Sequence, residues 1–252
     1  MCVVLHLGLI FLGLFSVVSP LHAGPFLDGQ RQAPRVADAL KRREPSVRRD
    51  FVDAGAAFPP SGLLLRHFKA EGQVEVWAPS ADPRSVYRLV RTLGVCMRSG
   101  DLGPKVLEGD LQVPEGVYTL ARFNPRSRFH LSLGLDYPNP VDRQRARRRG
   151  RPPGGDIMIH GGCVTIGCLP LGDTAIEWLY VAAALVMDRG QRPTVHAWPC
   201  RFGRADCRER LEAQPAHAAL WAELLKIDES FAQTQRPPRV EATPDGHYRV
   251  RQ

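Results

Sequence analysis

The chain has 252 residues, which is enough for one substantial core with appendages but not for two large ones. Its formal net charge of +8 favours anionic partners. Beyond residue 23 no stretch is long and apolar enough to span a bilayer, which excludes a protein with several membrane spans.

Residues 1–23 have the features of an export signal. An apolar run from Val3 to Val18 is followed by Ala23, a small residue where a signal peptidase would cut. We therefore predict an exported protein of the periplasm or cell envelope. Because no Lys or Arg precedes the run, the alternative is an uncleaved N-terminal anchor, and only in that case is the membrane a partner.

Residues 24–62 mix Pro, Gly, Ala and charges of both signs without apolar periodicity, which predicts a linker. From Leu63 onward, short runs rich in β-branched and aromatic residues alternate with Gly/Pro turns. This texture predicts a sheet of hairpin-connected strands. The predicted strands cover residues 73–78, 86–92, 116–123 and 128–135.

Six arginines crowd residues 143–151, between the last of these strands and a further one at 156–160. The cluster is either a solvated, mobile loop or a site for anionic wall polymer or lipid head groups. No aromatic stacking pattern accompanies it, so nucleic acid is not expected as a partner.

After Cys168 the pattern becomes helical. Thr174 and Glu177 have the spacing of a capping box, and Gly190 ends the apolar periodicity. A strand at 194–198 and a second helix starting at Pro215 follow, and residues 233–252 are predicted to form a flexible basic tail. The fold class is thus α+β, with a catalytic domain at 63–232 whose helices follow the cysteine.

The segment from His160 to Cys168 runs from a strand into a glycine-rich loop that ends before a helix. A cysteine at a helix N-terminus would have its pKa lowered by the helix dipole, and His160 could accept its proton. Glycines at positions 161, 162 and 167 permit tight turns and could direct N–H groups at an oxyanion.

The same residues allow two other interpretations. Cys163 and Cys168 could form a disulfide, or could join His160 as metal ligands with His196 as a fourth. Elsewhere Cys200 and Cys207 are the closest pair, and the five cysteines after residue 23 leave at least one unpaired. We expect neither a metal nor another cofactor.

The string from His160 to Cys168 resembles the active-site signature of L,D-transpeptidases of the YkuD type, in which His-Gly precedes Ser/Thr-x-Gly-Cys. Further ordered blocks resemble the YafK-like branch of that family, and the similarity covers residues 63–231. These blocks are Cys96 and residues 99–105, 108–110, 113–118 and 131–139.

The resemblance implies a β-rich catalytic fold with Cys168 as nucleophile and His160 as the residue that activates it. Thr165 occupies the family's Ser/Thr position, and Gly167 precedes the nucleophile. Ile166 departs from the pattern, because many members carry a second histidine there. Cys163 is then a bystander thiol.

Three further residues are candidates for substrate contact. Arg201 matches an arginine of the YafK-like branch and could pair with a substrate carboxylate. His130 and His196 could border the groove, although a lone histidine on a strand is more often structural.

We expect a cysteine acyltransferase that forms a thioester with a peptidoglycan stem peptide and passes it to an amine. The alternative is hydrolysis, as an L,D-carboxypeptidase or endopeptidase, of wall peptides or of links to a wall-anchored protein. A non-catalytic wall-binding module is the alternative of another class.

Overall fold

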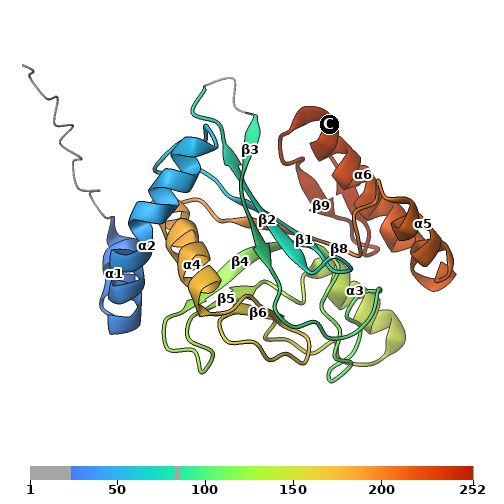
Figure 1. Cartoon of the computed structure of the whole chain (residues 1–252). Helices are drawn as coiled ribbons and strands as arrows, with labels where there is room; N and C mark the ends of the chain where they lie inside the picture. The colour runs from blue at the N-terminus through green and yellow to red at the C-terminus, as the bar shows by residue number, and fades with distance from the viewer. Residues whose placement is uncertain (1–23, 83–85, 252) are drawn as a thin grey trace, which may run out of the picture.

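The computed structural model describes residues 24–82 and 86–251, so the predicted export signal lies outside the described residues. Within them, a twisted sheet of eight strands has the order β3-β2-β1-β8-β4-β5-β6-β7 (Figure 1). The strands are β1 (Leu64–Phe68), β2 (Gln73–Pro79), β3 (Tyr87–Gly94), β4 (Gly116–Asn124), β5 (Ser132–Leu135), β6 (Met158–His160), β7 (Leu169–Pro170) and β8 (Thr194–Trp198).

The pairing confirms the hairpin-connected sheet for β1, β2 and β3 and for β4 and β5, which are antiparallel. Two pairs are parallel, β1 with β8 and β6 with β7. Strand β8 is late in sequence but lies between β1 and β4. The last predicted strand of the first group is shorter than expected, because β5 begins only at Ser132.

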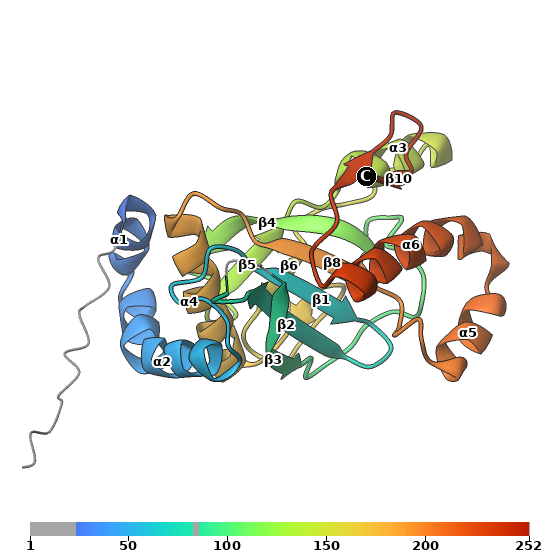
Figure 2. The same ribbon diagram turned by 90° about the horizontal axis from the view of Figure 1, so that it is seen from above.

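Helices cover the sheet in two groups. Helices α1 (Pro25–Arg31), α2 (Pro34–Asp53) and α4 (Asp173–Asp188) lie together at one side, and α5 (Ala205–Glu212) and α6 (Ala218–Thr234) lie at the other (Figures 1 and 2). Helix α4 is the centre of the first group, since every residue from Ile176 to Val186 is buried. Two hydrophobic cores result, one on each side of the sheet.

The prediction of a linker at residues 24–62 is wrong for its helical part. Helix α2 buries one stripe, with Val36, Ala39, Leu40, Val47 and Phe51 facing inward. The stripe packs on α4, where Phe51 stacks on Trp178 at 6.1 Å between ring centroids. The apolar residues of α2 are few and widely spaced among charged ones. The sequence of this segment alone therefore does not indicate a buried helix face, which is defined by the contact with α4.

The capping box predicted at Thr174 and Glu177 is also wrong. Helix α4 has Gly172 as its N-cap, and neither side chain caps it. Glu177 instead binds α2, accepting from Arg42 Nη2 at 2.6 Å and from Arg43 Nε at 2.8 Å.

The Arg-rich segment is a helix, not a loop. Helix α3 (Pro140–Arg149) starts at the N-cap Asn139, whose side chain and that of Asp142 bond each other's backbone N–H. Its arginines lie on the outside and partly pair with the C-terminal region, as Arg145 does with Glu223 at 3.6 Å.

The C-terminal region is more ordered than the sequence predicts. Pro215 starts a 3-10 turn, η1 (Pro215–His217), which leads into α6 (Ala218–Thr234), and α5 (Ala205–Glu212) precedes both. The predicted flexible tail forms a hairpin of β9 (Val240–Ala242) and β10 (Tyr248–Val250). The buried Tyr248 hydroxyl accepts a hydrogen bond from Asn139 Nδ2 at 2.7 Å, so the hairpin is fixed to the domain.

Among the described helices, none has the length and apolar character needed to cross a bilayer.

Candidate active site

Cys168 and His160 come together because β6 and β7 are adjacent parallel strands. His160 ends β6, where it pairs with Pro170, and Cys168 immediately precedes β7. Both side chains line one cavity of about 640 Å³. The structure therefore places the predicted pair at one site.

The His160 ring is oriented by the backbone. It is 2% exposed, lies tilted against the Phe129 ring at 4.7 Å between ring centroids, and its Nδ1 lies 2.6 Å from the carbonyl oxygen of Gly161. A carbonyl only accepts, so Nδ1 carries the proton and Nε2 of the neutral ring holds the lone pair. Burial lowers the pKa of His160, which favours this neutral form.

The electrostatics of Cys168 contradict the prediction of a helix-start thiolate. Helix α4 begins only at Asp173, and Cys168 leads into a strand instead. Burial raises the pKa of the half-buried thiol, and the Asp156 carboxylate raises it further, against a backbone hydrogen bond from Met158. The thiol donates to the Asp156 carbonyl at 3.7 Å, so the resting site pairs a thiol with a neutral imidazole.

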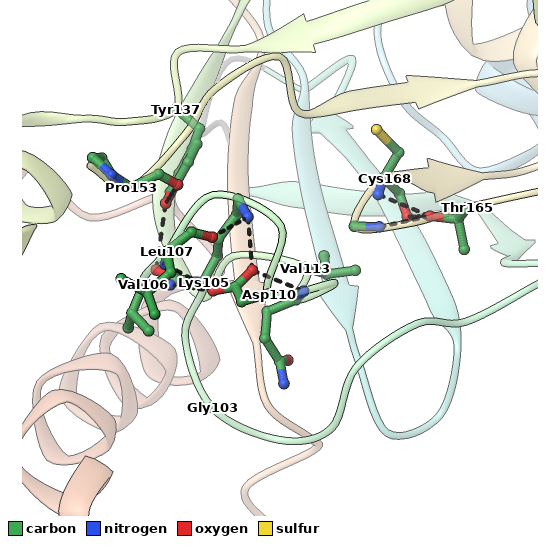
Figure 3. Close-up of polar contacts among 12 residues, drawn as sticks. Gly103, Lys105, Val106, Leu107, Asp110, Val113, Tyr137, Pro153, Thr165 and Cys168 are labelled. Carbon is green, nitrogen blue, oxygen red and sulfur yellow. Dashed lines mark hydrogen bonds and ion pairs between the residues drawn. The ribbon is translucent and has the colours of Figure 1, made fainter. Parts of the chain in front are cut away.

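Thr165 fixes the turn that presents Cys168. Its Oγ1 accepts from the backbone N–H of Gly167 at 3.1 Å and of Cys168 at 2.8 Å, and it donates to the Cys168 carbonyl at 2.8 Å. The sulfur lies on the far side of Cys168 from these bonds (Figure 3). The Thr165 hydroxyl oxygen thus already accepts from the backbone N–H groups of Gly167 and Cys168. In this structure these two N–H groups are therefore not available to bind an oxyanion.

Gly161 and Gly162 also fix the loop, through hydrogen bonds of their backbone N–H groups. The N–H of Gly161 donates to the Leu131 carbonyl at 3.1 Å, and that of Gly162 to Asp173 Oδ1 at 2.8 Å. A Cβ on Gly161 would lie 2.7 Å from the Phe129 carbonyl oxygen. These glycines therefore support the loop, and their amides also have partners already.

The cavity shared by His160 and Cys168, here the His160 cavity, has an apolar rim. Large exposed hydrophobic side chains at the rim are those of Leu111, Phe129, Val164 and Ile166. Ile166 is 79% exposed. The position that departs from the expected motif is thus occupied by an apolar surface group.

Cys168 also lines a second cavity of about 860 Å³. It is here called the Glu71 cavity, and its lining includes His67, Glu71, Arg98 and Ser99. Among the described residues, Cys168 is the single one that lines both cavities. Cys168 is therefore shared by two cavities whose other lining residues differ.

A loop that the site prediction did not include borders the His160 cavity. Buried Lys105 donates from Nζ to the Leu107 carbonyl and to Asp110 Oδ1, each at 2.7 Å, and Asp110 in turn accepts three backbone N–H groups (Figure 3). The signal was present in the sequence, because residues 99–105 and 108–110 are among the family-like blocks. Only the structure shows that this loop supports the site.

The three further candidates do not line either cavity. His130 Nε2 lies 2.9 Å from Glu177 Oε1, and Arg201 donates to Glu75 Oε1 at 2.6 Å while covering the Phe68 ring. His196 is fully buried beside Trp198, and burial lowers its pKa to about 3. All three serve contacts within the fold.

The cysteine pairing removes the alternatives left open by the sequence. Disulfides join Cys96 to Cys163 and Cys200 to Cys207, so Cys163 is not a bystander thiol. Of the cysteines that the structure describes, Cys168 is the free one. In the proposed zinc site, Cys163 could not be a ligand because it is in the disulfide, and His196 could not because it is buried in the core. The described residues contain no group of three His, Cys, Asp or Glu that could hold a metal ion.

Comparison with known proteins defines the family. No family model matches the chain. The chain is 30% identical over 194 residues to "Putative L,D-transpeptidase YafK" of Escherichia coli strain K12, covering 75% of this chain and 74% of the relative. The protein of the same name from Escherichia coli O157:H7 matches equally.

Solved structures also show similarity. The helical cell shape determining protein Pgp2 of Campylobacter jejuni matches with a TM-score of 0.44 and 18% identity, over 72% of this chain and 73% of Pgp2. Bd1075 of Bdellovibrio bacteriovorus matches with a TM-score of 0.39 and 16% identity, over 71% of this chain and 63% of Bd1075. On the sequence relationship to YafK, the chain belongs to the L,D-transpeptidase (YkuD-type) family of bacterial cell-wall enzymes, in its YafK-like branch.

Proposed function

We propose that the protein is an exported cysteine acyltransferase that acts on peptidoglycan stem peptides. The observation that carries this proposal is the fixed tautomer of His160, whose Nδ1 is held by the Gly161 carbonyl. Nε2 is then the base in a cavity that also contains the thiol of Cys168. Family membership supplies the substrate class.

In the first half-reaction, Nε2 of His160 takes the thiol proton as the sulfur attacks the carbonyl carbon of a stem peptide. A carbon–sulfur bond forms, the carbon–nitrogen bond to the terminal D-residue breaks, and His160 gives the proton to the leaving amine. In the second half-reaction, an acceptor amine loses a proton to His160 and attacks the thioester carbon, the carbon–sulfur bond breaks, and His160 returns the proton to the Cys168 sulfur. Transfer to water in place of the amine gives hydrolysis.

The two disulfides support the proposed export, because such bonds persist in oxidising compartments. An uncleaved N-terminal segment would make the membrane a partner in addition to the wall.

The proposal is tested by incubating the purified protein with tetrapeptide wall fragments and reading intact-protein and product masses. We expect an acyl adduct that maps to Cys168 and is absent from Cys168→Ala, with turnover reduced about 10²- to 10⁴-fold in His160→Ala. A peptide dimer indicates transfer, and a shortened or released peptide indicates hydrolysis, as does release of a wall-anchored protein. A wild-type protein that binds wall fragments but gives neither adduct nor product would favour a non-catalytic binding module and refute the proposal.

A further inference from the structure

A groove lined by arginines lies between helix α3 and the segment that follows it. It has a volume of about 670 Å³, and its lining consists of Arg143, Ala146, Arg147, Gly150, Arg151, Pro152 and Pro153. Among the described residues that line it, none is acidic. This space, here the arginine groove, therefore presents three guanidinium groups beside apolar Ala and Pro side chains.

The sequence of α3 turns these arginines outward. The buried residues of the helix are Val141, Asp142 and Ala146, and residues four positions apart share one face, so Arg143 and Arg147 lie together on another face. The carboxylate of Asp142 accepts from the backbone N–H of Asn139 at 3.0 Å, inside the fold. The acidic residue of α3 is thus not a surface partner for the arginines.

Half of the six arginines between residues 143 and 151 have no partner in the fold. Three of them bind the Pro138 carbonyl, Glu223 and the Asp245 carbonyl. The other three are exposed and form neither a hydrogen bond nor an ion pair with the rest of the described chain: Arg147, Arg149 and Arg151. Like charges four residues apart on a helix repel each other, so an anion bound in the arginine groove would relieve this repulsion.

The helix dipole explains only part of this cluster. Residues 147–149 form the last turn of α3, where the negative end of the dipole favours cations. Arg151, however, follows the C-cap residue Gly150, and Arg143 lies in the first half of the helix. Two of the three arginines that line the groove therefore have no role in stabilising the end of the helix.

The arginine groove and the His160 cavity share a wall. Pro153 lines the groove, and the next residue, Gly154, lines the cavity. This segment is fixed, because the Glu108 N–H donates to the Pro152 carbonyl at 3.1 Å and the Tyr137 hydroxyl donates to the Pro153 carbonyl at 3.0 Å (Figure 3). A molecule that reaches beyond the His160 cavity across this segment meets the arginines.

The position of the groove favours the wall over a membrane as its anionic partner. In the proposed function the substrate in the His160 cavity is part of a wall strand. A stem peptide ends in a carboxylate, so a strand that carries many stem peptides repeats this negative charge. Carboxylates are the groups that guanidinium binds with two parallel hydrogen bonds. The strand that enters the His160 cavity thus has the charge that the adjacent groove lacks.

We propose that the arginine groove is a docking surface for the carboxylates of a wall strand, at stem peptides other than the one that reacts at Cys168. Arg147 and Arg151 bind the carboxylates, and Arg143 completes the row. Because several weak contacts along one strand act together, the surface favours polymeric wall over an isolated stem peptide. This inference rests on the proposed function and adds a second contact between the enzyme and its substrate.

The test uses the full-length protein with Arg147→Gln and Arg151→Gln combined. The matched control combines Arg49→Gln and Arg88→Gln, which are exposed positions on α2 and β3 and remove the same charge. Both elements lie well away from α3 (Figures 1 and 2). The first measurement is Kd for protein-free wall sacculi, with Cys168→Ala present in every variant. The second is the ratio of kcat/KM on sacculi to kcat/KM on a soluble tetrapeptide, with Cys168 intact.

We expect the Arg147→Gln and Arg151→Gln pair to raise Kd for sacculi about 3- to 30-fold, since two exposed ion pairs are lost, and to lower the kcat/KM ratio by a similar factor. The difference should shrink as salt is added. Amidating the carboxylates of the sacculi should weaken binding of the parent protein to the level of this variant. Arg147→Lys with Arg151→Lys keeps the charge and should retain most of the binding.

Equal Kd values for the two Gln pairs, or binding that amidation leaves unchanged, would overturn the inference. Tighter binding to vesicles of phosphatidylcholine and phosphatidylglycerol than to sacculi, lost in the Arg147→Gln and Arg151→Gln pair, would also overturn it and assign the groove to a membrane surface. In each case an acyl adduct on Cys168 keeps the proposed function intact. Absence of the adduct refutes the proposed function instead, and the Kd values measured with Cys168→Ala still decide whether the groove binds the wall.

Discussion

The disulfide between Cys96 and Cys163 joins the segment after β3 to the loop that leads to Cys168, across 67 residues of sequence. Cys96 lines the Glu71 cavity, whereas the neighbours of Cys163 from Val164 to Gly167 line the His160 cavity. The bond thus ties together the walls of the two spaces that meet at the nucleophile.

Replacing Cys96 and Cys163 together by Ser should lower the free energy of unfolding by about 4 kcal/mol, from the loop entropy that the bond removes from the unfolded chain. The matched control is the double replacement of Cys200 and Cys207. Their disulfide closes a loop of only 7 residues, so its loss should lower the free energy of unfolding by about 2 kcal/mol. Urea unfolding without reductant measures both. A smaller loss from the first pair than from the second would show that the long bond does not constrain the fold.

Gly161→Ala should destabilise the protein by about 1–3 kcal/mol and lower turnover, because the added Cβ would collide with the Phe129 carbonyl and with Asp173 Oδ1. The collision displaces the residue whose carbonyl orients His160. Gly203→Ala is the control, since a Cβ there meets nothing within 4 Å. Thermal unfolding and adduct formation are the measurements, and equal behaviour of the two variants would contradict the steric argument.

The sequence predicts six of the eight strands of the sheet, because they are short, β-branched runs between Gly/Pro turns, but it does not predict β1, β7 or the position of β8 between β1 and β4. It also predicts that His160 and Cys168 lie near each other, because their motif is local, and both residues line the His160 cavity. The packing of α2 was not predictable, since the partners of Arg42 and Arg43 lie on α4, more than 130 residues away. For the same reason sequence spacing gave the wrong direction for the pKa of Cys168, which depends on burial and on Asp156.

Glu177→Gln should weaken the attachment of α2 to α4. Burial raises the pKa of Glu177, but hydrogen bonds from Arg42, His130 and Arg43 outweigh it and hold the pKa at about 2, below its ordinary value of 4.5. A carboxyl whose pKa is lower in the folded than in the unfolded state stabilises the fold at pH values above its unfolded pKa. This contribution is lost as the pH falls from 4.5 through about 2.

As the pH falls through this range, the free energy of unfolding of the wild type should therefore decrease by on the order of 2 kcal/mol more than that of Glu177→Gln. This figure allows for the solvent exposure of Arg42. Chemical denaturation at several pH values measures the difference. Identical pH dependence of the two proteins would show that the ion pairs contribute nothing measurable.

The protonation state of the site predicts how Cys168 reacts with iodoacetamide. Because burial raises the pKa of Cys168 and lowers that of His160, the resting pair is a thiol and a neutral imidazole. Only the thiolate is alkylated, so the rate should rise about tenfold per pH unit through pH 8 and 9. A preformed thiolate–imidazolium pair would instead give a plateau that begins in the acidic range. Cys168→Ala reports labelling of any other thiol, and a pH-independent rate between pH 6 and 8 at Cys168 would contradict the assignment.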